Sequence, residues 1–260
     1  MAGHKIKFSI ITATYNAAEV LPRLIASLQA QTDQDFEWVV ADGASTDGTL
    51  ALLEEAGQAL NVRVDSRPDF GIYDALNRAV KMAEGDYYLV VGADDELFPD
   101  AVGQYKSACQ ESEADLVTAK IEINGSPAGV RRFPLEWLYG PFAYVSGHAV
   151  GLAIRKSAHE AYGYYSNKFP IAADQLFILK VIHGRGRVRQ CDFISGRYFL
   201  GGASGADSLG CMLESYRIQC LVGHNFILQS AILFIRLIKN SWKINNYLRF
   251  RGGDALRRGK

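Results

Sequence analysis

An acidic pair, Asp94-Asp95, follows the apolar run "YYLVVG" and precedes "ELFP". Neighbouring carboxylates at the end of a strand suit a hard divalent cation, because Mg²⁺ takes one or two carboxylates together with the phosphate oxygens of a substrate. The alternative is a solvated turn, or an N-cap for the helix expected next. Asp42 and the acids between residues 69 and 74 are expected at the same edge of a sheet, and this context favours the cation site.

Four strand-like runs carry these polar residues, and a helix-like segment follows each of them. The runs are "KFSIIT" (7–12), "FEWVVAD" (36–42), "NVRVDSR" (61–67) and "DYYLVVGAD" (86–94). This alternation predicts right-handed βαβ units around a largely parallel sheet. Ligands bind at the carboxyl ends of such strands. One crevice should therefore be rimmed by the polar strand ends, which are Thr12, Asp42, Arg67 with Asp69, and Asp94 with Asp95.

The composition is that of a globular chain of 260 residues, 48% of them hydrophobic, which is enough for one substantial α/β domain with an appendage. With 28 basic and 28 acidic residues the formal charge is zero, so no overall field favours nucleic acid. The four cysteines are far apart and form no CxxC pair, which indicates reduced thiols in a reducing compartment. The apolar run near the N-terminus is too short for a signal peptide. We therefore expect a cytoplasmic protein.

Two further segments place polar residues where a helix begins. In "VVADGASTDGT", helix capping explains Ser45 and Asp47 but not Asp42, whose carboxylate could accept hydrogen bonds from a base or ribose. In "PDFGIYDALNRA", polar residues open a helix whose buried face needs only small and aliphatic side chains. Tyr73 in this segment either packs in the core or contacts a ligand, and both interpretations stay open.

The order of the segments "SIITATYNAAEVLPRLIASLQAQT", "EWVVADGASTDGT" and "RPDFGIYDALNRAVKMAEGDYYLVVGADDEL" resembles the family 2 glycosyltransferases, which use nucleotide sugars. The resemblance is close over residues 6–105 and looser to about residue 205. It implies an α/β fold of the GT-A (Rossmann-like) type, with a mostly parallel central sheet flanked by helices. It also implies a glycosyltransferase domain over 1–208, with a nucleotide-sugar half (1–112) and an acceptor half (113–208), before a basic helical extension (209–260).

The resemblance assigns roles to the residues of the N-terminal half. Asp95 would bind the metal, Mn²⁺ or Mg²⁺, and Asp94 would face the sugar or ribose. Many family members have a further acid or Asn where this chain has Ala93, so two carboxylates must serve both purposes. The nucleotide sugar would be bound by Thr12, Tyr15, Asn16, Asp42 (at the base), Asp69, Gly71, Tyr73 and Asn77.

On the acceptor side, "FPIAADQLFILKVIHG" resembles the segment that carries the catalytic base of inverting members, which maps to Asp174. A positioned carboxylate can take the proton of an attacking hydroxyl, and the alternative is that Asp174 only caps its helix. His148 resembles a position near the acceptor, although a lone His is more often structural. In "RYFLGGASG", Arg197 with Gly201, Gly202 and Ser204 suits either a turn or a mobile flap that meets a diphosphate.

The C-terminal tail segregates charge. Residues 235–260 contain eight basic side chains, one acid and three aromatic side chains, a composition that suits an anionic bilayer surface. The alternative is a helix that packs on the domain with a solvated basic face. RNA binding is the weakest option, because no nucleic-acid motif is present.

These patterns favour a metal-dependent, inverting glycosyltransferase. It would move a sugar from a nucleotide diphosphate sugar, with UDP preferred by family frequency, to a hydroxyl of a glycan or lipid-linked glycan in surface polysaccharide biosynthesis. Peripheral contact with the cytoplasmic face of the membrane would fit such an acceptor. The alternatives are a nucleotidyltransferase-like enzyme, although no glycine-rich phosphate loop is present, and a catalytically inactive protein that binds nucleotide sugars.

Overall fold

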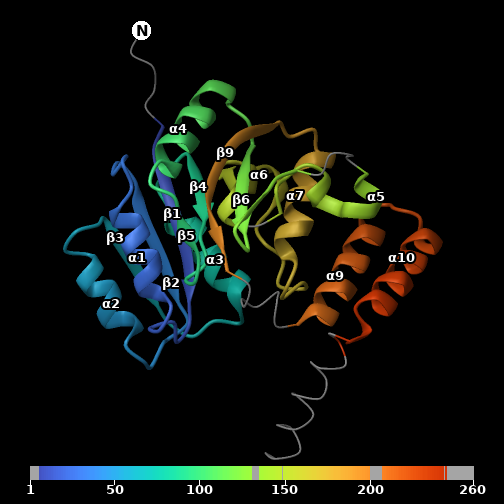
Figure 1. Cartoon of the computed structure of the whole chain (residues 1–260), viewed down its shortest axis with the longest axis horizontal. Helices are drawn as coiled ribbons and strands as arrows, with labels where there is room; N and C mark the ends of the chain where they lie inside the picture. Colours follow the sequence, from blue (N-terminus) through green and yellow to red (C-terminus); the bar gives the residue numbers. More distant parts are fainter. Residues whose placement is uncertain (1–5, 131–134, 148, 200–206, 243, 245–260) are drawn as a thin grey trace, which may run out of the picture.

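The N-terminal half alternates strands and helices as the sequence predicts (Figure 1). The computed structural model describes residues 6–130, 135–147, 149–199, 207–242 and 244. The elements of this half are β1 (Phe8–Thr14), α1 (Leu21–Gln29), β2 (Glu37–Asp42), α2 (Thr49–Ala56), β3 (Val62–Ser66), α3 (Ile72–Met82) and β4 (Tyr87–Val90). Their strands are all parallel and lie in the order β3-β2-β1-β4. The carboxyl ends of these strands therefore share one edge of the sheet.

The second half continues the same sheet but mixes strand directions. Its elements are β5 (Glu96–Leu97), α4 (Ala101–Ser112), β6 (Leu116–Ile123), β7 (Ser126–Ala128), α5 (Glu136–Tyr139), β8 (Leu152–Arg155), α6 (Ala158–Tyr162), α7 (Ala173–His183) and β9 (Val188–Tyr198). β8 runs antiparallel to β4 and β6, β9 is parallel to β6, and β5 is antiparallel to β9. The sheet is thus entirely parallel only in its N-terminal half, and the second half combines parallel and antiparallel pairs.

Helices cover both faces of the sheet because neighbouring side chains of a strand point to opposite faces. Ile10 of β1 packs with α1, α2 and α4 on one face, whereas Ile11 packs with α3, α6 and α7 on the other. Both isoleucines are fully buried. The central strands therefore read as continuous apolar runs, as expected for a sheet covered on both faces.

Two strands end at other residues than the sequence suggests. β1 continues to Thr14, so Thr12 lies inside the sheet and does not end the strand. β4 ends at Val90, and a turn closed by the hydrogen bond from Asp95 N to Gly92 O follows it. The acidic pair therefore lies in the turn between β4 and β5 and not at a strand terminus.

Two helices follow the sheet and lie side by side at one end of the molecule (Figure 1). They are α9 (Ser208–Leu221) and α10 (Phe226–Lys239), and each begins at a capping side chain, Asp207 and Asn225 respectively. Glu136 of α5 holds them to the domain, because its carboxylate accepts hydrogen bonds from His183 of α7 at 2.7 Å and from His224 at 2.8 Å. Within the described residues, no helix is both long enough and apolar enough to cross a bilayer. The division at residue 208 stays a prediction.

Candidate active site

At the carboxyl ends of β1, β2 and β3, three polar residues stand in register. Thr14 pairs with Asp42, and Asp42 pairs with Ser66. The carboxylate of Asp42 accepts hydrogen bonds from Thr14 Oγ1 at 2.9 Å, Ser45 N at 2.8 Å, Ser45 Oγ at 2.5 Å and Ser66 Oγ at 2.7 Å. Burial by itself raises the pKa of Asp42, but these hydrogen bonds to the charged form outweigh it and lower the pKa below its ordinary value.

Asp42 therefore joins three strand ends and does not face a ligand. Its side chain is fully buried and its carboxylate is used within the chain, so the predicted contact with a base is not available in this conformation. Capping alone does not explain the residue either, because two of its donors lie on other strands. In this structure Asp42 anchors the edge, and its contact with a base stays a prediction.

Two other predicted nucleotide contacts are also structural. Thr12 is fully buried, and its Oγ1 accepts a hydrogen bond from Trp38 Nε1 at 3.0 Å. The amide of Asn77 clamps the backbone of Tyr165, because Nδ2 donates to its carbonyl at 2.9 Å and Oδ1 accepts from its N–H at 3.0 Å. In this structure both side chains are occupied by partners within the protein. The sequence analysis did not predict these contacts, because the partners are distant in sequence.

The remaining nucleotide-side residues form an exposed surface at this edge. Tyr15 is 68% exposed, and Asn16 beside it is exposed in the left-handed backbone region at φ 47°. A Cβ atom on Gly43 would lie 2.8 Å from Asp69 Oδ2 and 3.2 Å from Tyr15 Cδ2, so only glycine allows these two side chains to approach. Asp69 also accepts a hydrogen bond from Gly71 N at 2.9 Å, where φ is 117°. This surface offers a ring, an amide and a carboxylate to a ligand.

The acidic turn lies on the same edge, because β4 is parallel to β1. Asp95 is fully buried, with Gly92 N 3.1 Å from its Oδ2 and Phe199 N 3.3 Å from its Oδ1. Burial, and after it the negative charge of Asp94, raise the pKa of Asp95 to about 7. A buried carboxylate with an acidic neighbour is a site where a cation would offset unfavourable charge, and its hard oxygens suit Mg²⁺ or Mn²⁺.

These two carboxylates do not form a complete metal cage. Among the residues that the structure describes, no group of three or more His, Cys, Asp or Glu side chains is arranged to hold a metal ion. A cation at Asp94 and Asp95 would therefore take further oxygens from its substrate or from water, which is the usual way Mg²⁺ binds beside phosphates. The residues present fit such a partly open site.

Arg197 does not face this turn as a free cation. Its guanidinium donates to Glu122 at 2.5 Å and to Glu96 at 3.1 Å across the paired strands β6, β9 and β5. In this structure Arg197 pairs neighbouring strands, and its role at a diphosphate stays a prediction. Arg23 of α1 is a cation that the sequence analysis missed, since its Nη1 donates to Asp94 O at 3.4 Å and its guanidinium lies 4.0 Å from the centre of the Phe199 ring.

Asp174 lies in the first turn of α7, and Tyr73 of α3 holds it. The Tyr73 hydroxyl is 2.6 Å from Asp174 Oδ1 and 3.0 Å from Ile171 O. The N-cap residue of α7 is Ala172, whose own side chain makes no capping hydrogen bond, whereas the Asp174 carboxylate accepts from backbone N–H groups of the first turn. Both interpretations of Asp174, as base and as helix cap, therefore stay open. Tyr73 is almost fully buried and its hydroxyl contacts the Asp174 carboxylate, while its predicted contact with the nucleotide sugar stays a prediction.

The environment of Asp174 favours proton uptake. Burial raises the pKa of Asp174 above its ordinary value, and the hydrogen bond from Tyr73 offsets part of this effect. Glu214 of α9 lies close by, because its Oε2 accepts from Ile171 N at 3.0 Å and from Ala172 N at 2.9 Å. Glu214 therefore serves as the distant cap of α7. No local pattern could have indicated it, since 42 residues separate it from Ala172.

Two predicted features lie outside the described residues. They are His148 and the glycines and serine of the proposed flap, Gly201, Gly202 and Ser204.

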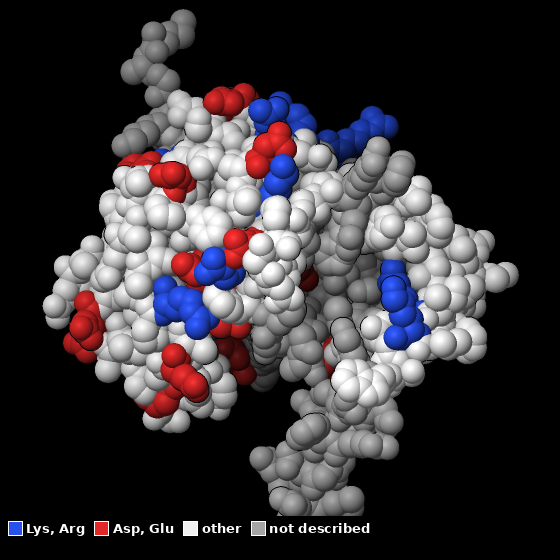
Figure 2. Space-filling model, in the orientation of Figure 1, with Lys and Arg blue, Asp and Glu red and all other residues white. Residues whose placement is uncertain are grey.

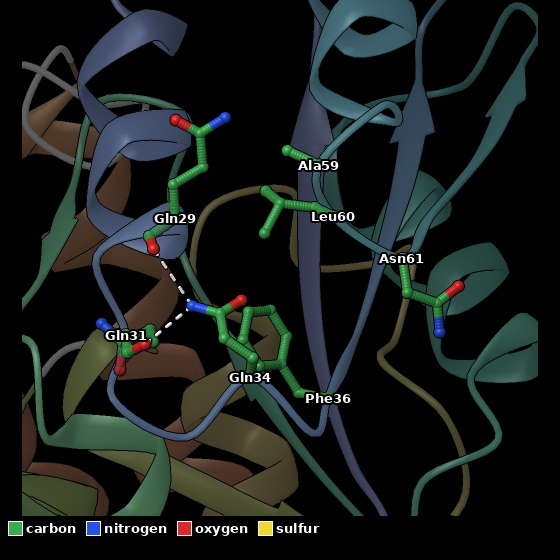
Figure 3. A pocket seen from close by; sticks show the side chains of 7 residues that line it. All are labelled: Gln29, Gln31, Gln34, Phe36, Ala59, Leu60 and Asn61. Atoms are coloured by element: carbon green, nitrogen blue, oxygen red, sulfur yellow. Dashed lines mark hydrogen bonds between the residues drawn. The ribbon is translucent and has the colours of Figure 1, made fainter.

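A cavity lined by described residues lies at the opposite edge of the sheet. It has a volume of about 420 Å³ and is lined by Gln29, Gln31, Gln34, Phe36, Ala59, Leu60 and Asn61 (Figure 3). Phe36 and Asn61 immediately precede β2 and β3, so this cavity is at the amino ends of the strands. Gln34 Nε2 there donates to the backbone carbonyls of Gln29 and Gln31. The lining contains no titratable side chain, so we assign no chemistry to it.

Curated relatives match less than half of the chain. A PGL/p-HBAD biosynthesis glycosyltransferase of Mycobacterium tuberculosis is 42% identical over 116 residues, which cover 42% of this chain and 44% of the relative. The poly(ribitol-phosphate) β-N-acetylglucosaminyltransferase TarS of Staphylococcus aureus is 33% identical over 125 residues, which cover 46% of this chain and 22% of TarS. The matches thus span less than half the length of these relatives.

Solved structures resemble nearly the whole chain. The structure of S. aureus TarS 1–349 in complex with UDP-GlcNAc has a TM-score of 0.68 at 23% identity, covering 88% of this chain and 70% of that one. The mannosyltransferase PcManGT from Pyrobaculum calidifontis, in complex with GDP-Man and Mn²⁺, has a TM-score of 0.65 at 15% identity, covering 97% and 81%. These likenesses confirm the predicted GT-A-type α/β fold. The family model "Glycosyl transferase family 2" matches residues 9–168, more than half of the chain, and the chain belongs to that family.

Proposed function

We propose that this chain is an inverting glycosyltransferase that moves a sugar from a nucleotide diphosphate sugar to a hydroxyl of a glycan or lipid-linked glycan. The observation that carries the proposal is the Tyr73–Asp174 pair, a partly buried carboxylate held at 2.6 Å by a phenol. Packing of the apolar core alone does not explain a carboxylate at this position. Membership in glycosyl transferase family 2 supports the reaction class.

Asp174 acts as the general base of the reaction. The acceptor hydroxyl attacks the anomeric carbon from the face opposite the diphosphate, the bond from that carbon to the diphosphate oxygen breaks, and the hydroxyl proton passes to Asp174. The raised pKa of Asp174 favours this uptake, because a base is most effective when its pKa lies nearer the working pH. Tyr73 keeps the carboxylate in place and leaves its second oxygen for the acceptor.

The donor is proposed to lie along the edge formed by Tyr15, Asn16, Asp69 and the acidic turn. Asp95, with Asp94 beside it, would hold Mn²⁺ or Mg²⁺, which when bound offsets the charge that builds on the leaving diphosphate. Arg23, which donates to the backbone of Asp94, adds positive charge at the same place. The two structural neighbours, in complex with UDP-GlcNAc and with GDP-Man and Mn²⁺, support a nucleotide sugar and a divalent metal. UDP is the preferred nucleotide.

The acceptor is proposed to belong to surface polysaccharide or glycolipid biosynthesis. The relatives from M. tuberculosis, a PGL/p-HBAD biosynthesis glycosyltransferase, and from S. aureus, a poly(ribitol-phosphate) β-N-acetylglucosaminyltransferase, support this class. A cytoplasmic location with peripheral contact at the inner face of the membrane would fit such an acceptor, and the basic tail supports that contact by its charge.

A donor screen tests the proposal. Nucleotide sugars are added to the protein with Mn²⁺ and with chelator, and the shift in melting temperature identifies the donor, because a ligand of the native state stabilises it. Release of the products from that donor is then measured. We expect a nucleoside diphosphate and free sugar. Pyrophosphate would indicate a nucleotidyltransferase, and donor binding without turnover in the presence of acceptor glycans would indicate a binding protein.

A further inference from the structure

The helix α10 is apolar on the side that faces away from the protein. Six large side chains, five in this helix and one three residues beyond its end, are 60–76% exposed, namely Phe226, Ile227, Phe234, Ile235, Ile238 and Trp242. Ile227, Phe234 and Ile238 follow each other at spacings of seven and four residues, so they form one stripe along the helix. A contiguous apolar face that is exposed on a helix normally marks a surface that contacts another protein or a membrane.

The opposite side of α10 is already used, which fixes the direction of the exposed stripe. Ile232 is buried, Gln229 Nε2 donates to Trp137 O at 2.7 Å, and the Arg236 guanidinium donates to Leu138 O. These three residues lie at spacings of three and four, on the side that contacts α5 and α9. The stripe cannot turn inward without breaking these contacts, so it needs another partner.

The charge around the stripe indicates what that partner is. Residues 226–242 contain no acid, and residues 243–260 add six basic side chains against one acid. In Figure 2 the end of the molecule where α10 lies is white with a blue group and no red on the face in view. An apolar stripe ending in Trp and followed by cations matches a helix that lies in the interface of an anionic bilayer. At 14 residues, α10 is too short to span one.

We propose that the outward face of α10 docks in the surface of an anionic lipid bilayer and turns the acceptor side of the site toward it. α9, which packs beside α10, contacts the start of α7 through the bonds from Ile171 N and Ala172 N to Glu214 and through Ser215 Oγ, which lies 3.0 Å from Gln175 Oε1. Asp174 lies in that same turn. The docked helix α10 is therefore connected to Asp174 by two helix contacts, α10 with α9 and α9 with the start of α7. An acceptor held in the bilayer would approach Asp174 from the side of α9 and α10. This orientation rests on the proposed role of Asp174, whereas the docking does not.

A vesicle experiment with neutral substitutions tests the docking. Phe234→Gln/Ile238→Gln removes apolar surface from the stripe without changing charge, and both positions are exposed, so the fold should be kept. Leu50→Gln on α2 is the matched control, because Leu50 is also an exposed aliphatic residue on a helix. Co-sedimentation of the full chain is measured with vesicles of phosphatidylcholine, with and without phosphatidylglycerol, and melting curves verify folding.

We expect the wild type and the Leu50 variant to sediment with the anionic vesicles and less with neutral ones. The double variant should partition roughly tenfold more weakly or worse, since two large side chains no longer enter the apolar layer. Equal sedimentation of the double variant and the wild type would overturn the proposal. So would a wild-type oligomer in solution that the double variant dissociates, because a second copy would then cover the stripe.

The test is independent of the catalytic proposal. Hydrolysis of the donor in solution needs no bilayer, so the double variant should hydrolyse the donor like the wild type. Loss of vesicle binding with normal hydrolysis leaves the glycosyl transfer proposal standing, and an inactive protein that still binds vesicles leaves the docking standing.

Discussion

Asp174→Asn tests whether the carboxylate of Asp174, in the first turn of α7, accepts a proton during glycosyl transfer. Asn has nearly the same volume, and its side-chain oxygen can still accept the hydrogen bond that Tyr73 donates at 2.6 Å. The substitution also keeps an acceptor for the backbone N–H groups of the first turn of α7, and Glu214 still binds the N–H groups of Ile171 and Ala172. The fold should therefore be kept, and only the ability to take a proton is lost.

The expected loss of turnover is about 10²–10⁴-fold, the range that general-base catalysis supplies, which corresponds to about 2.7–5.4 kcal/mol in activation free energy. Stability should move in the other direction. Because the folded-state pKa of Asp174 is raised, its charge costs stability at pH values above that pKa, and a neutral Asn removes this cost. We expect an unchanged or slightly higher melting temperature at neutral pH.

The assay is the release of nucleoside diphosphate from the preferred donor with acceptor present, followed over pH. In the wild type the rate should fall as the pH drops through the folded-state pKa of Asp174, which lies above the ordinary value for an aspartate, and the variant should lack this acid limb. Asp192→Asn is the control, since the Asp192 side chain is fully exposed on β9. Near-normal turnover of Asp174→Asn with the acid limb intact would refute the assignment of the base.

Three further substitutions separate the roles at this edge. Tyr73→Phe removes a donor to the carboxylate, and since a hydrogen bond to a charged group contributes about 1.5–3 kcal/mol, turnover on the acid limb should fall about ten- to hundredfold and the limb should move to higher pH; an unchanged pH profile would show that Tyr73 only fills the core. Asp42→Ala should lower the free energy of unfolding by about 2–4 kcal/mol in urea titrations, because it leaves buried donors without an acceptor. An unchanged unfolding midpoint together with lost nucleotide affinity would instead indicate that Asp42 contacts the base of the nucleotide. Asp95→Asn removes the charge of the side chain and keeps its volume. It should abolish the Mn²⁺-dependent rise in melting temperature that we expect for the wild type with nucleoside diphosphate. A rise in the variant equal to that of the wild type would place the metal elsewhere.

Local sequence was sufficient for the elements and for the position of the candidate base. The β-branched and aliphatic runs of β1 and β2, each followed by a helical pattern, predict the parallel half of the sheet, because period and composition are local properties. Asp174 was indicated by the resemblance of its segment to that of family 2 glycosyltransferases, and its role as the base stays a prediction. Strand ends were less well predicted: β4 stops at Val90, because the tight turn that follows it depends on backbone hydrogen bonds.

Only the tertiary structure decided which polar side chains are available to a ligand. Asp42 and Arg197 stand in patterns that suggest binding, yet the fold places donors from three strand ends on one and carboxylates from neighbouring strands on the other. The Tyr73–Asp174 contact joins residues 101 positions apart, and the outward stripe of α10 is apparent only once its inner side is seen to be occupied. The physical reason is common to these cases. Hydrogen bonds and burial are set by what the chain brings together across strands and helices, and a residue's own neighbours in sequence carry little information about those partners.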